Sequence, residues 1–174
     1  MGTDKALLAW RGATLIEWVA LQVRQTVGSV TLVGAPERYS GLDLAAIGEA
    51  SPGQGPLSGL EAALRHSDCQ LNLVVACDMP GLRAEALKDL VQAAVRAGAD
   101  VCAAMRPEGG PEPLCAVYHR RLLPQVQAAL REGRLRMRDL LAQWEVVHWM
   151  DGRPGLTANV NRPEDWEAML DAGD

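Results

Sequence analysis

The residue of this sequence that first suggests chemistry is Asp78, a carboxylate placed after an apolar run and just before a proline. The nearly continuous run 71–77 is apolar on both faces, which is typical of a buried parallel strand, and Pro80 ends it because proline lacks a ladder donor. The carboxyl end of such a strand is where open α/β sheets bind ligands. Asp78 is therefore a candidate metal ligand or catalytic group, or else the cap of a following helix.

A second candidate is the segment 49–59, which places three glycines and two prolines in eleven residues. This composition indicates a shaped loop. From Leu57 to Leu64 the apolar residues recur at helical spacing, so the loop leads into a helix at about Pro56. Backbone N–H groups at such an entry can face an anion. A tight connection that binds no ligand explains the pattern equally well.

Two polar stretches lie further along the chain. Asn161 precedes a closing helical segment, where an asparagine can serve as a plain N-cap. A basic stretch surrounds Gly133, and its arginines either complement the end of a helix or extend into solvent. It consists of Arg131, Arg134, Arg136 and Arg138.

The composition limits the possible partners. The formal net charge of -5 argues against a general nucleic-acid binder, because such proteins cluster Lys and Arg against the phosphates. An acidic protein can still bind one nucleotide through a divalent cation, a lysine and backbone N–H groups. We therefore expect a small-molecule partner rather than a nucleic acid.

The four cysteines form no C-x-x-C pair, and the three histidines complete no metal pattern with them. Buried thiols in a reduced cytoplasmic compartment are the simplest explanation. No apolar run approaches the roughly 20 residues of a membrane span, and no signal segment opens the sequence. We expect a cytoplasmic protein without a membrane partner.

Strands alternate with helices along the 174 residues, 48% of which are hydrophobic, so the chain suits one domain with a sizeable core. Thr14 and Glu17 have capping-box spacing, and Gly28 closes the first helix. We expect a three-layer, doubly wound α/β fold with a mainly parallel sheet. Its strands are expected at 30–33, 45–47, 71–77, 101–104, 114–118 and 146–149, and its helices at 14–28, from 56, 82–98, 122–130 and through 166–170.

Four separated pieces of the sequence, taken together, carry a resemblance to a known family. They are Met1-Gly2-Thr3-Asp4-Lys5-Ala6-Leu7-Leu8, Gln54-Gly55-Pro56-Leu57-Ser58-Gly59, Ala76-Cys77-Asp78-Met79-Pro80 and Asn159-Val160-Asn161-Arg162-Pro163-Glu164-Asp165. In this order they resemble the molybdenum cofactor guanylyltransferase family, which joins a guanylyl group from GTP to molybdopterin. Sugar nucleotidyltransferases share versions of the first and third pieces, so the N-V-N-x-P-E pattern narrows the choice. The resemblance implies a Rossmann-like nucleotidyltransferase fold.

The sequence departs from the family at its start. The family's first strand and its glycine-rich loop L-x-G-G-x-S-x-R precede M-G-x-D-K and are absent here. We therefore expect residues 1–174 to form a single nucleotidyltransferase-like domain that is incomplete at its N-terminus, with Met1 internal to a longer natural protein. Loss of the loop should weaken triphosphate binding, and loss of a central strand should leave ladder groups unpaired.

The resemblance implies specific roles on the nucleotide side. Lys5 matches the lysine that contacts the phosphates, and a flexible ammonium suits such a point-charge contact. Asp78 matches the Mg²⁺-binding aspartate of the GTP site. Glu49 and Gly34 align with guanine- and ribose-proximal positions, where the family more often has Asp and Asn. The loop that shapes the nucleotide pocket corresponds to Gly55, Pro56 and Gly59.

On the acceptor side, Asn159 and Asn161 match polar residues near molybdopterin, and Arg136 aligns with an arginine that could pair with its terminal phosphate. The implied reaction is direct attack of that phosphate on the α-phosphorus of Mg·GTP, without a covalent enzyme intermediate. Transient contact with other molybdenum cofactor biosynthesis proteins or with target molybdoenzymes would fit this activity.

Three other functions remain open. A cytidylyl- or sugar-phosphate nucleotidyltransferase would use the same lysine and metal with another base or acceptor. A non-catalytic paralogue would have lost its phosphate loop and kept a binding role. A signalling receiver domain could use Asp78 as a phosphoacceptor, but the chain is long for one and shows no acidic pair after a first strand.

Overall fold

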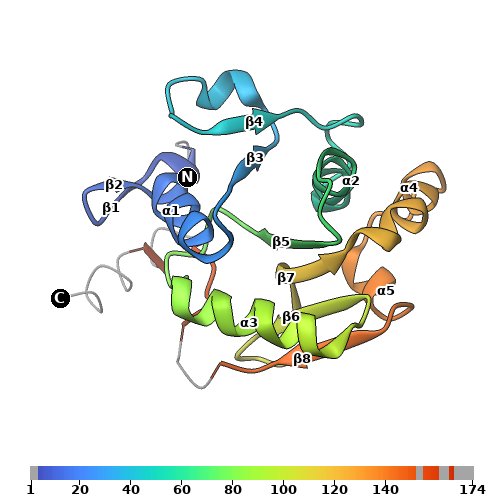
Figure 1. Cartoon of the computed structure of the whole chain (residues 1–174). Helices are drawn as coiled ribbons and strands as arrows, with labels where there is room; N and C mark the ends of the chain where they lie inside the picture. The colour runs from blue at the N-terminus through green and yellow to red at the C-terminus, as the bar shows by residue number, and fades with distance from the viewer. Residues whose placement is uncertain (1–3, 152–154, 161–164, 167–174) are drawn as a thin grey trace.

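The computed structural model describes residues 4–151, 155–160 and 165–166, which form an α/β fold (Figure 1). The strands and helices expected up to residue 149 appear in the predicted order, and further short elements lie between them. They are η1 (Lys5–Leu7), β1 (Ala9–Trp10), β2 (Ala13–Thr14), α1 (Leu15–Val27), β3 (Thr31–Val33), η2 (Pro36–Tyr39), β4 (Ala45–Ile47), α2 (Pro56–His66), β5 (Leu71–Val75), α3 (Ala84–Ala97), β6 (Val101–Met105), β7 (Pro111–His119), η3 (Arg120–Leu122), α4 (Leu123–Arg131), α5 (Met137–Leu141) and β8 (Val146–Trp149).

The main sheet has the strand order β5-β7-β6-β8. Strand β7 runs antiparallel to both β5 and β6, whereas β8 runs parallel to β6. Three of its four strands, β5, β6 and β8, therefore point the same way, which agrees with the expected mainly parallel sheet, whereas β7 is inserted between β5 and β6 and runs in the opposite direction. The sequence analysis did not predict this antiparallel insertion. Strand β7 follows β6 through a short hairpin at 106–110 and begins at Pro111, before the expected start of this strand at residue 114.

The remaining strands form two smaller sheets. Strands β3 and β4 pair in parallel, with Leu32 opposite Ala46. Strands β1 and β2 form an antiparallel hairpin that the sequence analysis did not predict. The turn of this hairpin places Arg11 and Gly12 at positive φ values of 49° and 83°. Among the described residues, β3 pairs only with β4 and β5 pairs only with β7, so the other edge of each strand has no partner strand.

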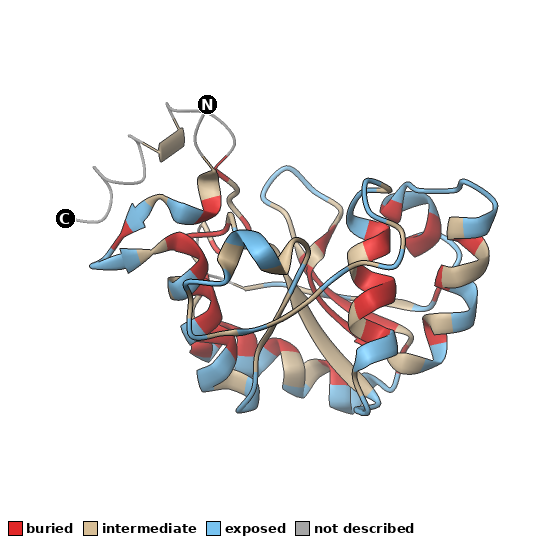
Figure 2. Cartoon of the chain, turned by 90° about the horizontal axis from the view of Figure 1, so that it is seen from above, coloured by how far each residue is buried: buried red, intermediate tan, exposed pale blue. Residues whose placement is uncertain are grey.

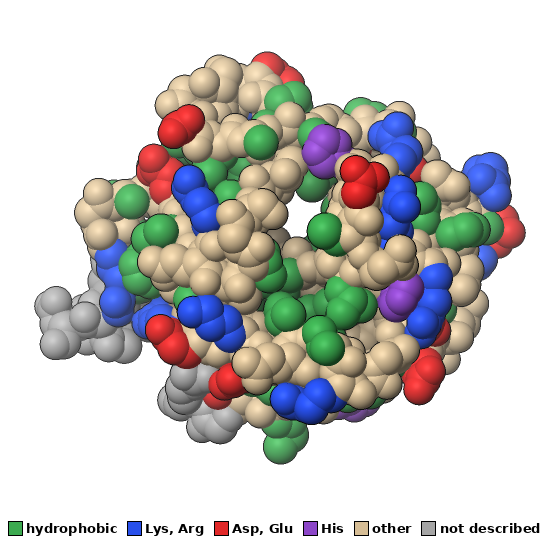
Figure 3. Space-filling view, viewed as in Figure 1, with side chains coloured by type: hydrophobic (Ala, Val, Ile, Leu, Met, Phe, Trp, Pro, Cys, Tyr) green, Lys and Arg blue, Asp and Glu red, His purple; other side chains and the backbone are tan. Residues whose placement is uncertain are grey.

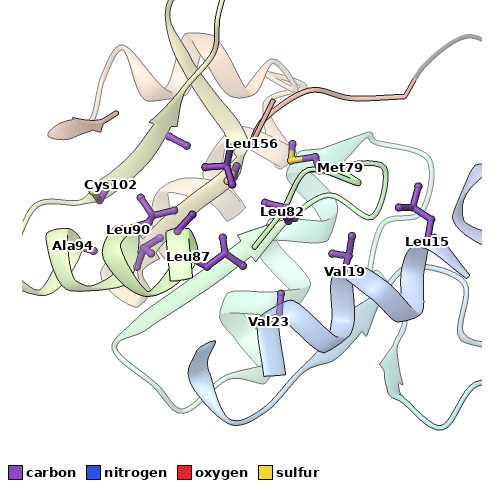
Figure 4. Close-up of a cluster of buried hydrophobic side chains, with 14 of the residues drawn as sticks. Leu15, Val19, Val23, Met79, Leu82, Leu87, Leu90, Ala94, Cys102 and Leu156 are labelled. Atoms are coloured by element: carbon purple, nitrogen blue, oxygen red, sulfur yellow. The ribbon is translucent and has the colours of Figure 1, made fainter. Parts of the chain in front are cut away.

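Helices cover both faces of the main sheet, which confirms the three-layer arrangement. Helices α1 and α3 pack with Cys102 and Val117 in one hydrophobic cluster, part of which is shown in Figure 4. Helices α2, α4 and α5 pack with Ala103 and Tyr118 in a second cluster. Alternate residues of β6 and β7 thus point to opposite faces, as the pleat requires. None of the described helices is long and apolar enough to cross a membrane.

The helix ends confirm the local predictions for α1. Thr14 and Glu17 form the expected capping box, with the Thr14 N–H donating to Glu17 Oε2 at 2.9 Å. The C-cap is Gly28, in the left-handed region at φ 83°. The hydrogen bond from Thr14 lowers the pKa of Glu17. The start and end of α1 are therefore set by residues within it or beside it.

Strand β5 is less enclosed than its place in the fold suggests. All five of its residues are of intermediate exposure, and Figure 2 shows the strand in tan. Val33 of β3 is 36% exposed. The space-filling view shows an opening through the molecule between β3, α2 and β5 (Figure 3). The unpaired edges of β3 and β5 border this opening.

Candidate active site

Asp78 lies in the turn between β5 and α3, where the sequence places it. Arg83 occupies the N-cap of α3, so the alternative that Asp78 caps this helix is wrong. The Asp78 Oδ1 atom is buried and has no hydrogen-bond partner among the described residues. Burial raises the pKa of Asp78, and its own backbone hydrogen bond and the charge of Lys5 oppose that rise. Because a buried oxygen without a donor is costly, this atom is suited to an ion or ligand.

Residues 155–160 pack against the Asp78 turn although they lie far from it in the sequence. The buried Val160 donates its N–H to the Asp78 carbonyl oxygen at 3.0 Å. The neighbouring Asn159 has a buried Oδ1 atom that also lacks a hydrogen-bond partner in the described part of the chain. The structure thus brings Asn159 next to the Asp78 turn, and one side-chain oxygen of each residue finds no partner within the described ranges.

The close packing of these two segments depends on Gly81. A Cβ atom added there would overlap the carbonyl oxygen of Gly155 and lie 2.9 Å from its carbonyl carbon. We expect Gly81→Ala to lower the free energy of unfolding by about 1–3 kcal/mol, as overpacking against backbone does. Urea denaturation of the variant and the wild type measures this loss.

The matched control for this substitution is Gly41→Ala. A Cβ atom at Gly41 would meet nothing within 4 Å. The control should therefore stay within about 0.5 kcal/mol of the wild type. Equal effects of the two substitutions would contradict the close approach of residues 155–160 to the Asp78 turn.

Lys5 opens the short helix η1 and lies close enough for its charge to act on Asp78. Asp4 caps η1, with its Oδ1 atom accepting a hydrogen bond from the Ala6 N–H at 3.1 Å. The Lys5 charge is one of the causes that lower the pKa of Asp78. The structure therefore places the Lys5 charge within electrostatic range of Asp78, although 73 positions separate the two residues in the sequence.

Glu49 follows β4 and faces the beginning of α2. Its Oε2 atom accepts a hydrogen bond from Ser58 Oγ at 2.8 Å. A Cβ atom at Gly59 would lie 3.5 Å from Glu49 Oε1 and 3.9 Å from Val33 Cγ1, so this residue of α2 lies close to the ends of both strands. The hydrogen bond from Ser58 holds the Glu49 carboxylate against the beginning of α2.

Gly55 and Pro56 form the entry to α2 as predicted. Gly55 is the N-cap with φ 72° and ψ -164°, a conformation that favours glycine, and Pro56 is the first helical residue. The sequence analysis did not select Gln54, whose Oε1 atom is buried without a hydrogen-bond partner among the described residues. A polar residue between two glycines of a shaped loop was the signal that could have identified it.

Gly34 ends β3 and donates its N–H to the Ile47 carbonyl oxygen at 3.0 Å. It therefore lies at the end of the β3–β4 pair, near the position where the chain continues to Glu49. Without a side chain, Gly34 can offer a ligand only backbone groups.

Arg136 is placed apart from this group of residues. It is the N-cap of α5 and lines a recess of about 270 Å³. The recess is lined by Gly133, Arg134, Leu135, Arg136, Asp139 and Gln143, and neither Lys5, Asp78 nor Asn159 belongs to it. Asn161, the other predicted acceptor-side residue, lies outside the described residues.

Several known proteins are similar to this chain in sequence. The family described as MobA-like NTP transferase domain matches residues 1–147. A relative from Deinococcus radiodurans, named a probable molybdenum cofactor guanylyltransferase, is 35% identical over 174 residues and covers 99% of this chain and 89% of its own length. A relative of the same name from Bacillus subtilis is 28% identical, with 97% and 87% covered.

Solved structures share the fold. Molybdopterin-guanine dinucleotide biosynthesis protein A from Archaeoglobus fulgidus has a TM-score of 0.84 at 25% identity, covering 99% of this chain and 93% of that one. The 2-C-methyl-D-erythritol 4-phosphate cytidylyltransferase from Thermus thermophilus has a TM-score of 0.72 at 19% identity, covering 97% and 93%, and so shares the fold. The resemblance inferred from the four sequence pieces is confirmed. The chain belongs to the MobA-like NTP transferase family, whose members are nucleotidyltransferases.

Proposed function

We propose that this nucleotidyltransferase transfers GMP from GTP to molybdopterin and releases pyrophosphate. The names of the relatives from Deinococcus radiodurans and Bacillus subtilis support the choice of donor and acceptor. The observation that carries the proposal is the buried Asp78 Oδ1 atom, which lacks a hydrogen-bond partner in the described part of the chain and feels the charge of Lys5. A carboxylate with an ammonium charge in its electrostatic range suits a metal-bound triphosphate.

Asp78 fits a magnesium ion in its donor chemistry. Mg²⁺ is usually held by one or two carboxylates, water and the phosphates of its substrate. The described residues contain no cluster of three or more His, Cys, Asp or Glu side chains that could hold a metal. Asp78 would therefore be the principal protein ligand, and the ion would offset charge on the triphosphate.

The remaining roles belong to the chain itself. Lys5 would hold the phosphates through its ammonium group while the acceptor phosphate attacks the α-phosphorus in line. The loop that contains Gly55, Pro56 and Gly59 would shape the nucleotide pocket, and Gly34 would approach the ribose with its backbone. Asn159, Asn161 and Arg136 would contact molybdopterin. Positioning and electrostatics account for most phosphoryl-transfer catalysis, so no covalent intermediate is needed.

Glu49 would read the guanine, since a carboxylate accepts hydrogen bonds from the base N–H groups. We expect Glu49→Gln to weaken GTP binding by about 10- to 100-fold, because it replaces a charge-assisted hydrogen bond worth about 1.5–3 kcal/mol. Isothermal titration with GTP measures the change. The control is Glu145→Gln, an exposed glutamate that should leave the affinity unaltered. Equal affinities for all three proteins would exclude Glu49 from the base site.

The nearest competing function is a cytidylyl- or sugar-phosphate nucleotidyltransferase. Competition of GTP against CTP in a transfer assay with molybdopterin separates these functions. Preferential use of GTP supports guanylyl transfer, whereas preferential use of CTP contradicts it. Failure of any nucleotide to bind would favour a non-catalytic paralogue.

We further propose that residues 1–174 form a single domain that is incomplete at its N-terminus and that an upstream strand fills the opening between β3 and β5. Both strands have an edge that pairs with no strand of the described residues, and this supports the proposal because backbone groups at a sheet edge favour a partner strand. The intermediate exposure of every β5 residue supports it as well. A glycine-rich loop following that strand would bring further backbone N–H groups to the triphosphate.

We also propose that the protein acts in the cytoplasm. Cys69, Cys77, Cys102 and Cys115 are all free, which fits a reduced cytoplasmic compartment. The product would pass on through transient contact with other molybdenum cofactor biosynthesis proteins or with target molybdoenzymes.

A further inference from the structure

The side chain of Asp4 links two parts of the site that no strand pairing joins. Its Oδ2 atom accepts hydrogen bonds from Tyr39 Oη at 3.1 Å and from Arg38 Nη1 at 3.3 Å. Its Oδ1 atom accepts the Ala6 N–H at 3.1 Å. One carboxylate therefore binds η1, which begins with Lys5, to η2, which follows β3.

This link joins a very short turn to a distant segment of the chain. Helix η1 is a three-residue 3-10 turn, and so short a turn is weak by itself. The carboxylate of Asp4 is 24% exposed and the Arg38 side chain 62% exposed, so the ion pair is partly screened. The hydrogen bond from Tyr39 is the better shielded of the two contacts with η2. Burial and this hydrogen bond raise the pKa of Tyr39, so the phenol keeps its proton and remains a donor.

The position of the link relates it to catalysis. Lys5 is the next residue after Asp4, and its charge reaches Asp78. The same three-residue turn that Asp4 caps therefore carries the ammonium group. A shift of this turn would move the Lys5 charge relative to Asp78 and to the phosphates between them.

We propose that Asp4, held by Tyr39 and Arg38, is a positioning residue that fixes the Lys5 ammonium against the reacting phosphates. This inference rests on the proposed function, because it concerns the same nucleotidyl transfer. It adds Asp4, Arg38 and Tyr39 to the site. Asp4 positions Lys5, and Tyr39 and Arg38 hold Asp4 in place.

The test is a double-mutant cycle between Tyr39→Phe and Lys5→Ala, measured on nucleotidyl transfer in the form of the protein that shows it. With Lys5 present, Tyr39→Phe should lower kcat about tenfold and change KM for the nucleotide less than about twofold, as misplacement of a catalytic group does. With Lys5 replaced by alanine, the same change should cost less than about twofold. Equal losses in both backgrounds would overturn the proposal.

The matched control is Tyr118→Phe, which removes the other tyrosine hydroxyl of the chain. That hydroxyl donates to the Pro113 carbonyl oxygen at 2.8 Å in the second hydrophobic cluster. The control should lower stability without a kcat effect that depends on Lys5. Asp4→Asn should reproduce the behaviour of Tyr39→Phe in both backgrounds, and an additive effect of Asp4→Asn would also contradict the proposal.

A second measurement separates this inference from the proposed function. If the wild type transfers no nucleotide, the proposed function fails, and amide hydrogen exchange at Ala6 then decides the inference. The Ala6 N–H donates to Asp4, so Tyr39→Phe should speed its exchange at least about threefold if Tyr39 holds Asp4 in place. Unchanged exchange would overturn the link between η1 and η2.

Discussion

Asp78→Asn is expected to lower kcat for GMP transfer by at least about 10³-fold, because it removes the carboxylate that would hold the metal of the donor nucleotide. The variant should remain folded. An asparagine has nearly the same shape, and the Val160 N–H bonds to the backbone oxygen of residue 78 rather than to its side chain. Steady-state transfer assays at saturating Mg²⁺ and GTP measure the loss.

The same substitution should not reduce stability in the absence of metal. Burial raises the pKa of Asp78, so at pH 7 the metal-free folded state carries a carboxylate charge that it disfavours. Asparagine removes this penalty, and we expect a higher free energy of unfolding in EDTA at pH 7. The gain should vanish as the pH falls below about 4, where the carboxyl is protonated in the unfolded chain as well.

The control for Asp78 is Asp68→Asn, an exposed aspartate before β5 at the other end of that strand. It should leave kcat and stability near wild-type values. Near-normal activity of Asp78→Asn with an intact circular dichroism spectrum would refute the metal assignment. Loss of folding in that variant would mean that the carboxylate has a structural role instead.

Extending the chain upstream by roughly 20 residues, a strand of ordinary length with a loop, should restore tight nucleotide binding. We expect the affinity for GTP with Mg²⁺ to rise at least tenfold, roughly the effect of one charge-assisted hydrogen bond from the added loop. The added strand would pair with the free edges of β3 and β5 and should also raise the free energy of unfolding. Calorimetry on both forms measures the affinities.

The matched control is the same extension with two prolines placed in its apolar run. Proline lacks the ladder donor, so this version should gain neither stability nor affinity. Binding that is equally tight in the unextended chain would contradict the need for another strand. No binding by any of the three forms would favour the non-catalytic paralogue.

The sequence predicted well those features that depend on neighbouring residues. The capping box of Thr14 and Glu17 and the C-cap at Gly28 are formed by groups within one helix and its flanks. The strand that ends before Asp78 and the helix that begins at Pro56 were likewise predicted from local apolar patterns and proline positions. A pattern of this kind reports which faces of an element are buried, but not which element covers them.

The contacts between distant segments came only from the structure. The antiparallel insertion of β7 depends on the pairing of Val117 with both Leu73 and Cys102, which alternating hydrophobicity does not specify. The contact between Val160 and the Asp78 turn and the link from Asp4 to Tyr39 each join residues with no periodic relation.

The sequence by itself thus determined the kinds of elements, the motifs of the family and the two charged residues proposed for catalysis. The tertiary structure decided the strand order, the neighbours of Asp78 and the support of Lys5. The physical reason is that local hydrogen bonds and side-chain periodicity are encoded within a few residues. Pairing between distant segments, in contrast, depends on the packing of the whole chain.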